Sequence, residues 1–169
     1  MKKLLFISLA ICFGWVSQAQ VDTSNILMNG QQMPNFKIST MDGKTVQSAE
    51  LKGKTVLINF FATWCGPCRK ELPHVESDIW KKYKDRDDFL LLIIGREEDS
   101  KKIAPFIKDN DYTMPFYGDI DRSCYKQFAH KFIPRNYLFN SKGKLIYQSR
   151  GFNEKEFEEM KKNLAEQLD

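Results

Sequence analysis

Several features that would assign this chain to a fibrous, membrane-spanning or nucleic-acid-binding class are absent from it. No apolar run reaches the roughly 20 residues that a comfortable membrane-spanning helix needs, and the chain has neither internal repeats nor low-complexity linkers. The net charge is only +4 and falls to +2 once Lys2 and Lys3 are set aside. No nucleic-acid footprint is implied by so small a surplus.

What remains is the composition of one ordinary globular domain. The chain has 169 residues, of which 42% are hydrophobic and 13% aromatic. This is enough for one domain with a proper core and too few for two. We predict an extended lead-in over residues 20–33 and a single folded domain over residues 34–169.

The first 19 residues have the pattern of a secretory signal. A basic start, Met1–Lys3, precedes the apolar run Leu4–Val16, and small residues lie at −3 and −1 of a cleavage site after Ala19. Cleavage there gives a mature chain that begins at Gln20. An uncleaved anchor and a lipoprotein attached through Cys12 are the alternatives. Each of them places the chain outside the cytosol.

Cysteine is scarce, with four in the chain and three in the predicted mature part. An odd number leaves at least one thiol unpaired within the chain. Cys65 and Cys68 are only three residues apart, and so small a loop restricts the unfolded chain too little to be a useful structural crosslink. We interpret this pair as chemical, and Cys124 as a half-buried core cysteine.

The hydrophobic pattern predicts an α/β fold around one mixed sheet. Leu72, Val75, Ile79 and Tyr83 share one helical face, and Asp-Gly at 42–43 is a hairpin signal. Buried strands joined through helices favour a parallel core, which a closing hairpin makes mixed. The expected strands are 35–39, 45–47, 55–61, 89–94, 135–139 and 145–149; further helices are expected at 100–110 (interrupted or kinked near Pro105), at 122–131 and after a cap at Asn153.

The segment that carries chemistry is Trp64-Cys65-Gly66-Pro67-Cys68, between a buried strand and an amphipathic helix. This placement puts Cys65 at the helix N-terminus, where unpaired N–H groups and the helix dipole favour a thiolate. Pro67 suits the first turn, because its missing N–H costs nothing there. One turn on, Cys68 lies within disulfide reach. We predict that an exposed Cys65 attacks a partner disulfide and that a more buried Cys68 resolves the mixed disulfide.

Two other uses of a Cys-x-x-Cys pair stay open at this point. A zinc half-site needs two further ligands, but His74 and His130 do not follow a knuckle-like spacing. We read both histidines as ordinary helix-surface residues and expect no metal. The second alternative is a structural disulfide.

The run at 60–73, Phe-Phe-Ala-Thr-Trp-Cys-Gly-Pro-Cys-Arg-Lys-Glu-Leu-Pro, resembles the active-site segment of the TlpA/ResA-like branch of thioredoxin-fold proteins, which is related to the AhpC/TSA redoxins. Residues 34–36, 42–44 and 51–54 resemble the lead-in hairpin of the same branch. The resemblance spans residues 33–168. It implies a thioredoxin-like fold, with a central mixed β-sheet flanked by helices and an added N-terminal β-hairpin.

The resemblance also implies roles for single residues. In this branch the acidic residue three positions after the second cysteine lies near the thiols, and here it is Glu71. Glu71 is expected to take the proton from Cys68 as that thiol attacks; the alternative is a first-turn glutamate that stabilises the helix dipole. Thioredoxins carry a buried aspartate six positions before the first cysteine. Asn59 has that place here, which favours Glu71 as the substitute.

A second landmark of the family is a cis-proline opposite the disulfide, and Ile133-Pro134 is its expected counterpart. A cis X–Pro bond exposes backbone that can pair with a substrate strand. Arg135 follows where a small or hydroxylated residue is often found. It is expected to shift the thiolate pKa, to recognise an acidic partner or to form a surface salt bridge. Trp64 is expected to shield Cys65 and to contact partners.

Taken together, the resemblance implies an exported thiol-disulfide oxidoreductase, monomeric and without a cofactor. Gly66-Pro67 is the dipeptide of the reducing members, so we predict a periplasmic or cell-envelope reductase of protein disulfides, with a membrane electron donor and apocytochrome c or other exported proteins as partners. A peroxiredoxin-like peroxidase is one rival, although Ala62 occupies the place of that family's threonine. The other is a copper chaperone with His130 as third ligand.

Overall fold

One mixed β-sheet organises residues 23–168, the part of the chain that the computed structural model describes. Across these residues the strand order is β2-β1-β5-β4-β3-β6-β7. Strands β3, β4 and β5 run parallel, and the other neighbours are antiparallel. The strands are β1 (Lys37–Thr40), β2 (Thr45–Gln47), β3 (Thr55–Phe61), β4 (Phe89–Arg96), β5 (Phe116–Asp119), β6 (Arg135–Phe139) and β7 (Leu145–Arg150).

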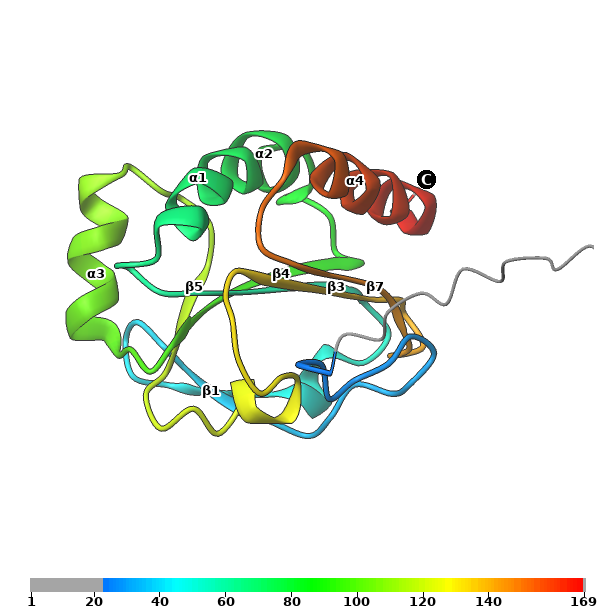
Figure 1. Ribbon diagram of the computed structural model, residues 1–169, viewed down its shortest axis with the longest axis horizontal. Helices are drawn as coiled ribbons and strands as arrows, with labels where there is room; N and C mark the ends of the chain where they lie inside the picture. Colours follow the sequence, from blue (N-terminus) through cyan, green and yellow to red (C-terminus); the bar gives the residue numbers. More distant parts are fainter. Residues whose placement is uncertain (1–22, 169) are drawn as a thin grey trace, which may run out of the picture.

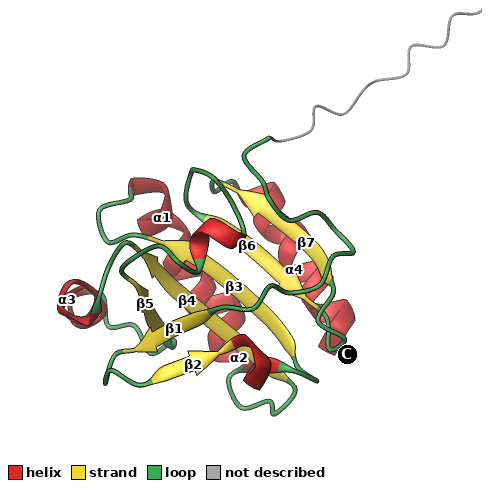
Figure 2. Cartoon of the chain, turned by 90° about the horizontal axis from the view of Figure 1, so that it is seen from below, coloured by secondary structure: helices red, strands yellow, loops and turns green. Residues whose placement is uncertain are grey.

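Helices cover one face of this sheet, while loops and short helical turns cover the other (Figure 1). Figure 2 shows the sheet from the loop side, with β1 and β2 along one edge and β7 along the other. The helical elements are α1 (Gly66–His74), η2 (Val75–Trp80), α2 (Lys81–Tyr83), α3 (Ser100–Asp109) and α4 (Glu154–Leu168), with the 3₁₀ turns η1 (Ser48–Leu51) and η3 (Tyr125–Gln127).

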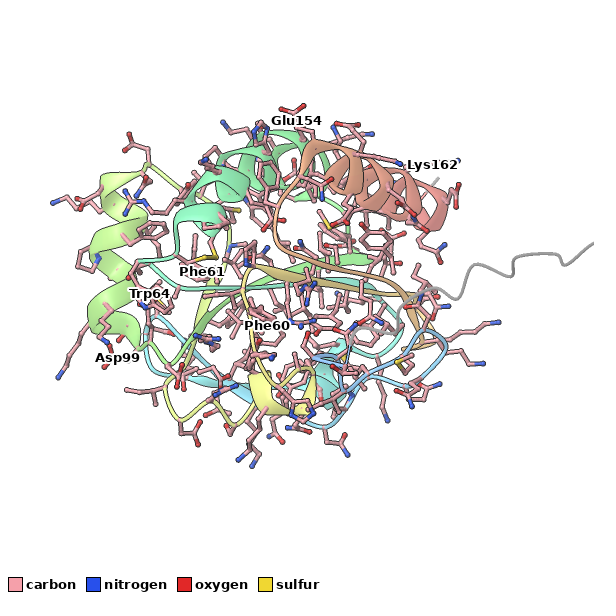
Figure 3. All side chains as sticks on the ribbon, in the orientation of Figure 1. Phe60, Phe61, Trp64, Asp99, Glu154 and Lys162 are labelled. Carbon is pink, nitrogen blue, oxygen red and sulfur yellow. A yellow bond between two sulfur atoms is a disulfide. The ribbon has the colours of Figure 1, made fainter. Side chains whose placement is uncertain are left out.

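The sheet divides the hydrophobic core into two layers, and strand β3 contributes to both. All seven of its residues are buried, as expected for a strand covered on both faces. Leu57 and Phe61 pack in the helix-covered layer, whereas Ile58 and Phe60 pack on the loop-covered side. Figure 3 shows Phe60 and Phe61 pointing to opposite sides of the sheet. The same alternation puts Asn59 on the helix side, beneath the segment that follows the cysteines.

Most of the predicted elements are confirmed, including the lead-in hairpin. Its first strand is displaced to Lys37–Thr40, and it also pairs with β5, so the hairpin extends the main sheet. At the other end of the domain, the Asn153 side chain accepts a hydrogen bond from the Glu156 N–H and begins α4 as predicted. The predicted signal segment and Cys12 lie outside the described residues. Within the described residues, no helix is long and apolar enough to cross a membrane.

The predicted helix at 122–131 is wrong, because only the 3₁₀ turn η3 forms there. Arg122 has a φ of 60°, which is incompatible with a right-handed helix. The Asp119 carboxylate accepts hydrogen bonds from the N–H groups of Cys124 and Tyr125. Since these side-chain bonds replace helical ones, a short turn is the stable local structure.

Strand β5 was not expected from the sequence. Its four residues, Phe-Tyr-Gly-Asp, include two poor strand formers, and the strand is stabilised by partners on both sides, β4 and β1. Gly118 is needed here for a close approach: a Cβ at this position would lie 2.9 Å from the Glu98 carbonyl oxygen. The glycine that weakens the strand pattern therefore allows the neighbouring loop to pack.

Proline does not interrupt α3, one of the two effects predicted near Pro105. Pro105 lies within the continuous helix Ser100–Asp109 and on its exposed side. Its ring costs one backbone hydrogen bond in the middle of the helix, and the buried contacts of Ile103 and Phe106 hold the helix on the sheet. In the helix after the cysteines, Pro73 precedes the π-helical stretch η2. The apolar face predicted for this helix is nevertheless buried, as the low exposure of Leu72, Val75, Ile79 and Tyr83 shows.

Candidate active site

The two cysteines lie where β3 gives way to α1 and form a disulfide, with a Cα–Cα distance of 5.3 Å. Cys65 is the N-cap of α1, and its Sγ accepts a hydrogen bond from the Cys68 N–H at 3.3 Å. The Cys65 N–H in turn donates to the Ala62 carbonyl at 3.0 Å, which closes a tight turn before the helix. A thiolate at Cys65 would therefore face a backbone donor and the positive end of the helix dipole.

The two cysteines differ less in solvent exposure than predicted. Cys65 is 4% exposed and Cys68 is fully buried, so the expectation of an exposed Cys65 is wrong for the disulfide form. The order is still as predicted, because only Cys65 borders a surface recess. Trp64, which is 66% exposed, lines the same recess and presents much of its ring to solvent.

Glu71 lies one helical turn after Cys68 and on the same face of α1. Its side chain is 1% exposed. The Asn59 amide donates to one carboxylate oxygen at 2.8 Å, and the Asn136 amide donates to the other at 2.7 Å. The alternative of a first-turn glutamate that stabilises the helix dipole is wrong, because α1 begins at Gly66 and Glu71 lies beyond its first turn. Asn59, at the position where thioredoxins carry a buried aspartate, directly contacts Glu71.

Burial raises the pKa of the Glu71 carboxyl from its ordinary value of 4.5 to about 7. The hydrogen bonds from Asn136 and Asn59 favour the ionised form and only partly offset the desolvation. A carboxyl with this pKa exchanges its proton near neutral pH, which suits a general acid or base.

The cis peptide bond predicted at Ile133-Pro134 is present. The Ile133 carbonyl oxygen lies 3.8 Å from Cys65 Sγ, so the loop and the disulfide face each other directly. A surface recess of about 360 Å³ borders both the loop and the disulfide. Its lining consists of Trp64, Cys65, Gly66, Pro67, Arg96, Phe132 and Ile133.

Burial contradicts two of the three roles predicted for Arg135, the surface salt bridge and the recognition of an acidic partner; an effect on the thiolate pKa stays a prediction. Its side chain is 1% exposed and faces the loop-covered side of the sheet, whereas its neighbour Asn136 faces Glu71. The guanidinium donates to the Ser24 hydroxyl, to the Asn25 side-chain oxygen and to the Lys131 carbonyl. Arg135 therefore ties the lead-in segment to the loop that carries the cis-proline.

We expect Arg135→Leu to lower the free energy of unfolding by about 3 kcal/mol, because it leaves the buried Ser24 hydroxyl and the part-buried oxygens of Asn25 and Lys131 without their donor. Urea or thermal unfolding followed by circular dichroism measures the change. Arg86→Leu is the matched control: Arg86 forms a surface ion pair with Asp88, and its loss should cost about 1 kcal/mol or less. Equal effects of the two substitutions would contradict the role assigned to Arg135.

Four contributors to the site were missed by sequence reasoning. Glu98, which is 1% exposed, accepts hydrogen bonds from the Thr63 N–H at 2.9 Å and the Thr63 hydroxyl at 2.8 Å, and so holds the turn before the cysteines. Arg96, which lines the recess, is the second, and Asn136 and Phe132 are the other two. The only signal for Asn136 and Phe132 was their position near Ile133-Pro134 along the chain. Glu98 is 35 residues from Thr63, and no local pattern indicates it.

The remaining candidates are separate from the disulfide. Cys124 is free and fully buried, more so than predicted, and burial raises the pKa of its thiol. His74 is exposed and stacks on Phe152, and His130 is exposed at the end of its turn. Among residues 23–168, no three His, Cys, Asp or Glu side chains are grouped to hold a metal ion.

Comparison with known proteins agrees with this geometry. The family model described as Redoxin matches residues 28–168. The thiol-disulfide oxidoreductase ResA of Bacillus thuringiensis is 31% identical over 127 residues, which cover 75% of this chain and 72% of the relative. The thioredoxin-like protein YneN of Bacillus subtilis is 30% identical over 142 residues, or 83% of this chain and 82% of the relative.

The fold is also found among solved structures. A solution structure from Bacteroides thetaiotaomicron, provisionally named a protein disulfide isomerase, superimposes with a TM-score of 0.82 at 38% identity. The match covers 86% of this chain and 92% of that one. The central mixed sheet with its helices is thus the architecture of thioredoxin-like proteins.

Proposed function

The chain belongs to the Redoxin family and is a TlpA/ResA-like thiol-disulfide oxidoreductase, and on this premise we propose that it acts outside the cytoplasm as a reductase of protein disulfides. The observation that carries the proposal is the arrangement around one disulfide. Cys65 caps a helix and faces the cis-proline loop, while Cys68 lies one turn from a buried glutamate whose pKa is about 7.

The reaction begins with the reduced pair. The Cys65 thiolate attacks one sulfur of a partner disulfide, and the other partner sulfur leaves as a thiolate and takes up a proton. The Cys68 sulfur then attacks Cys65 in the mixed disulfide. The partner sulfur that was bonded to Cys65 leaves, and the Cys65–Cys68 disulfide forms. Two electrons have passed to the partner, and a dithiol donor must return them.

Glu71 serves the second of these steps. A neutral Cys68 thiol is a weak nucleophile, and the buried surroundings disfavour its ionisation. An ionised Glu71 on the same helical face can take the thiol proton as Cys68 attacks. Its pKa of about 7 lets it release the proton again near neutral pH.

The cellular setting rests on the sequence. The signal-like segment at residues 1–19 supports export to a periplasm or cell envelope, where disulfides are common. A membrane protein is then the fitting electron donor, with apocytochrome c or other exported proteins as substrates. Two exposed aromatic residues beside Cys65, Trp64 and Phe132, support a macromolecular partner. We propose that the protein acts as a monomer.

The direction of electron flow is tested by the reduction potential of the Cys65–Cys68 couple. We expect a value near that of thioredoxin, about −270 mV, when the mature domain is equilibrated with dithiothreitol buffers. A value near the oxidising end of the superfamily, about −120 mV, would make it a disulfide-forming enzyme. The absence of a two-electron transition would contradict redox function altogether.

A further inference from the structure

Two large aromatic side chains stand exposed on either side of the reactive sulfur. Trp64 is 66% exposed and Phe132 is 48% exposed, and both line the recess that borders Cys65. Exposed apolar groups gathered in this way mark interaction sites more often than chance. Exposed aromatic side chains alone would accept many partners, so selectivity among polypeptide partners must come from the polar groups around them.

Phe132 is held in its exposed position by the backbone. Its φ is 73°, a left-handed conformation that a bulky residue rarely adopts without a functional reason. The Tyr125 hydroxyl donates a hydrogen bond to the Phe132 carbonyl oxygen, which ties this conformation to the buried turn η3. The backbone of Phe132 thus presents its side chain at the recess.

Cations contact both rings. The Lys131 ammonium and the Arg150 guanidinium each lie 5.1 Å from the centre of the Phe132 ring. The Arg96 guanidinium lies 5.9 Å from the centre of the Trp64 ring. Two carboxylates lie in the same region: Glu97 pairs with Arg96 at 3.2 Å, and the buried Glu98 accepts hydrogen bonds from Thr63, next to Trp64. Of these two acids only Glu97 is exposed, so the charges that a partner meets at the two rings are mainly positive.

We propose that this surface, formed by Trp64, Phe132, Arg96, Lys131 and Arg150, selects an extended polypeptide segment that carries acidic side chains beside its cysteine. The inference rests on the proposed reductase function and names its substrate class. The Ile133 carbonyl, next to Cys65, is placed to pair with the backbone of such a segment. Carboxylates of the segment then meet the cations on both sides, which favours both encounter and correct placement. The acid recognition that the sequence suggested for Arg135 thus belongs to other residues.

The test compares two short peptides with the same internal disulfide, one with aspartates and one with lysines beside the cysteines. Each rate of reduction by the reduced enzyme is divided by the rate with dithiothreitol, which removes the effect of the flanking charges on disulfide reactivity. We expect the normalised kcat/KM to favour the acidic peptide about tenfold at low salt, because a few partly exposed charge pairs give a preference of this order. The preference should shrink as salt rises.

Reversing the charges at the proposed surface tests whether these residues cause the preference for the acidic peptide. The double variant Lys131→Glu/Arg150→Glu is expected to favour the lysine peptide; the ratio of the two rates is independent of how much variant is folded. Lys52→Glu/Lys142→Glu is the matched control, because these lysines line a separate depression. It should keep the wild-type preference.

The outcomes separate this inference from the proposed function. Equal normalised rates for the two peptides, with continued reduction of a small neutral disulfide by the wild type, would overturn the acidic substrate class and leave the reductase in place. Failure of the wild type to reduce the small disulfide would overturn the reductase itself. A preference that changes equally in the control variant would show a general effect of net charge and would overturn the assignment to this surface.

Discussion

Cys68→Ser is expected to stop turnover and to leave Cys65 covalently joined to its partner. Cys65 caps α1 and borders the recess, so its attack does not need Cys68 sulfur. Without the resolving sulfur, the mixed disulfide cannot be released. Acid quenching followed by mass spectrometry detects the adduct. Cys65→Ser should form no adduct, and both variants should lose at least about 10³-fold in turnover, as expected when a nucleophile is removed.

Cys124→Ala is the control for this experiment. Cys124 is fully buried and free, and its raised thiol pKa keeps it unreactive. Its variant should retain turnover and the two-electron transition. An adduct on Cys65→Ser together with none on Cys68→Ser would reverse the roles of the two cysteines.

Glu71→Gln is expected to slow release of the partner from the mixed disulfide by about 10²-fold at pH 8, the lower end of general-base effects. In the wild type this rate should rise with pH as Glu71 ionises through about pH 7. The variant should lack that rise, and the two proteins should converge in acid. Rapid-quench measurement of partner release over pH 5–9 gives both profiles.

Glu76→Gln provides a matched control on the same run of helix. Glu76 is also buried, and its carboxylate accepts hydrogen bonds from the backbone of Thr113 and Met114. Its replacement should lower stability and leave the pH profile of partner release unchanged. An identical loss in both variants would mean that Glu71 acts through folding alone.

The raised pKa of Glu71 also has a consequence for stability. Its folded pKa of about 7 exceeds the ordinary value of 4.5, so the native state holds the proton more tightly than the unfolded chain. The stabilising contribution is fully present below pH 4.5 and is lost as pH rises through about 7, with a limit on the order of 3 kcal/mol. Glu71→Gln should remove this pH dependence. Unfolding free energies measured at pH 4.5 and pH 8 provide the check.

The reactive pair and the elements on either side of it could be predicted from the amino-acid sequence alone. A continuous buried run predicts β3, apolar spacing predicts the helix, and Cys65 with Cys68 in between leaves little choice of chemistry. These signals are local: each depends on residues within one or two turns of one another. Glu71 was also accessible from the sequence, through the resemblance of residues 60–73 to the active-site segment of the family.

The groups that complete the site are brought together by contacts between distant parts of the chain. Glu71 obtains its environment from Asn59 and Asn136, which come from two neighbouring strands. Arg135 is turned away from the disulfide by the alternation of β6. Glu98 reaches Thr63 across 35 residues. Such contacts depend on which strands become neighbours and on which face each side chain points to, and burial on folding then sets the charges and pKa values that no local spacing encodes.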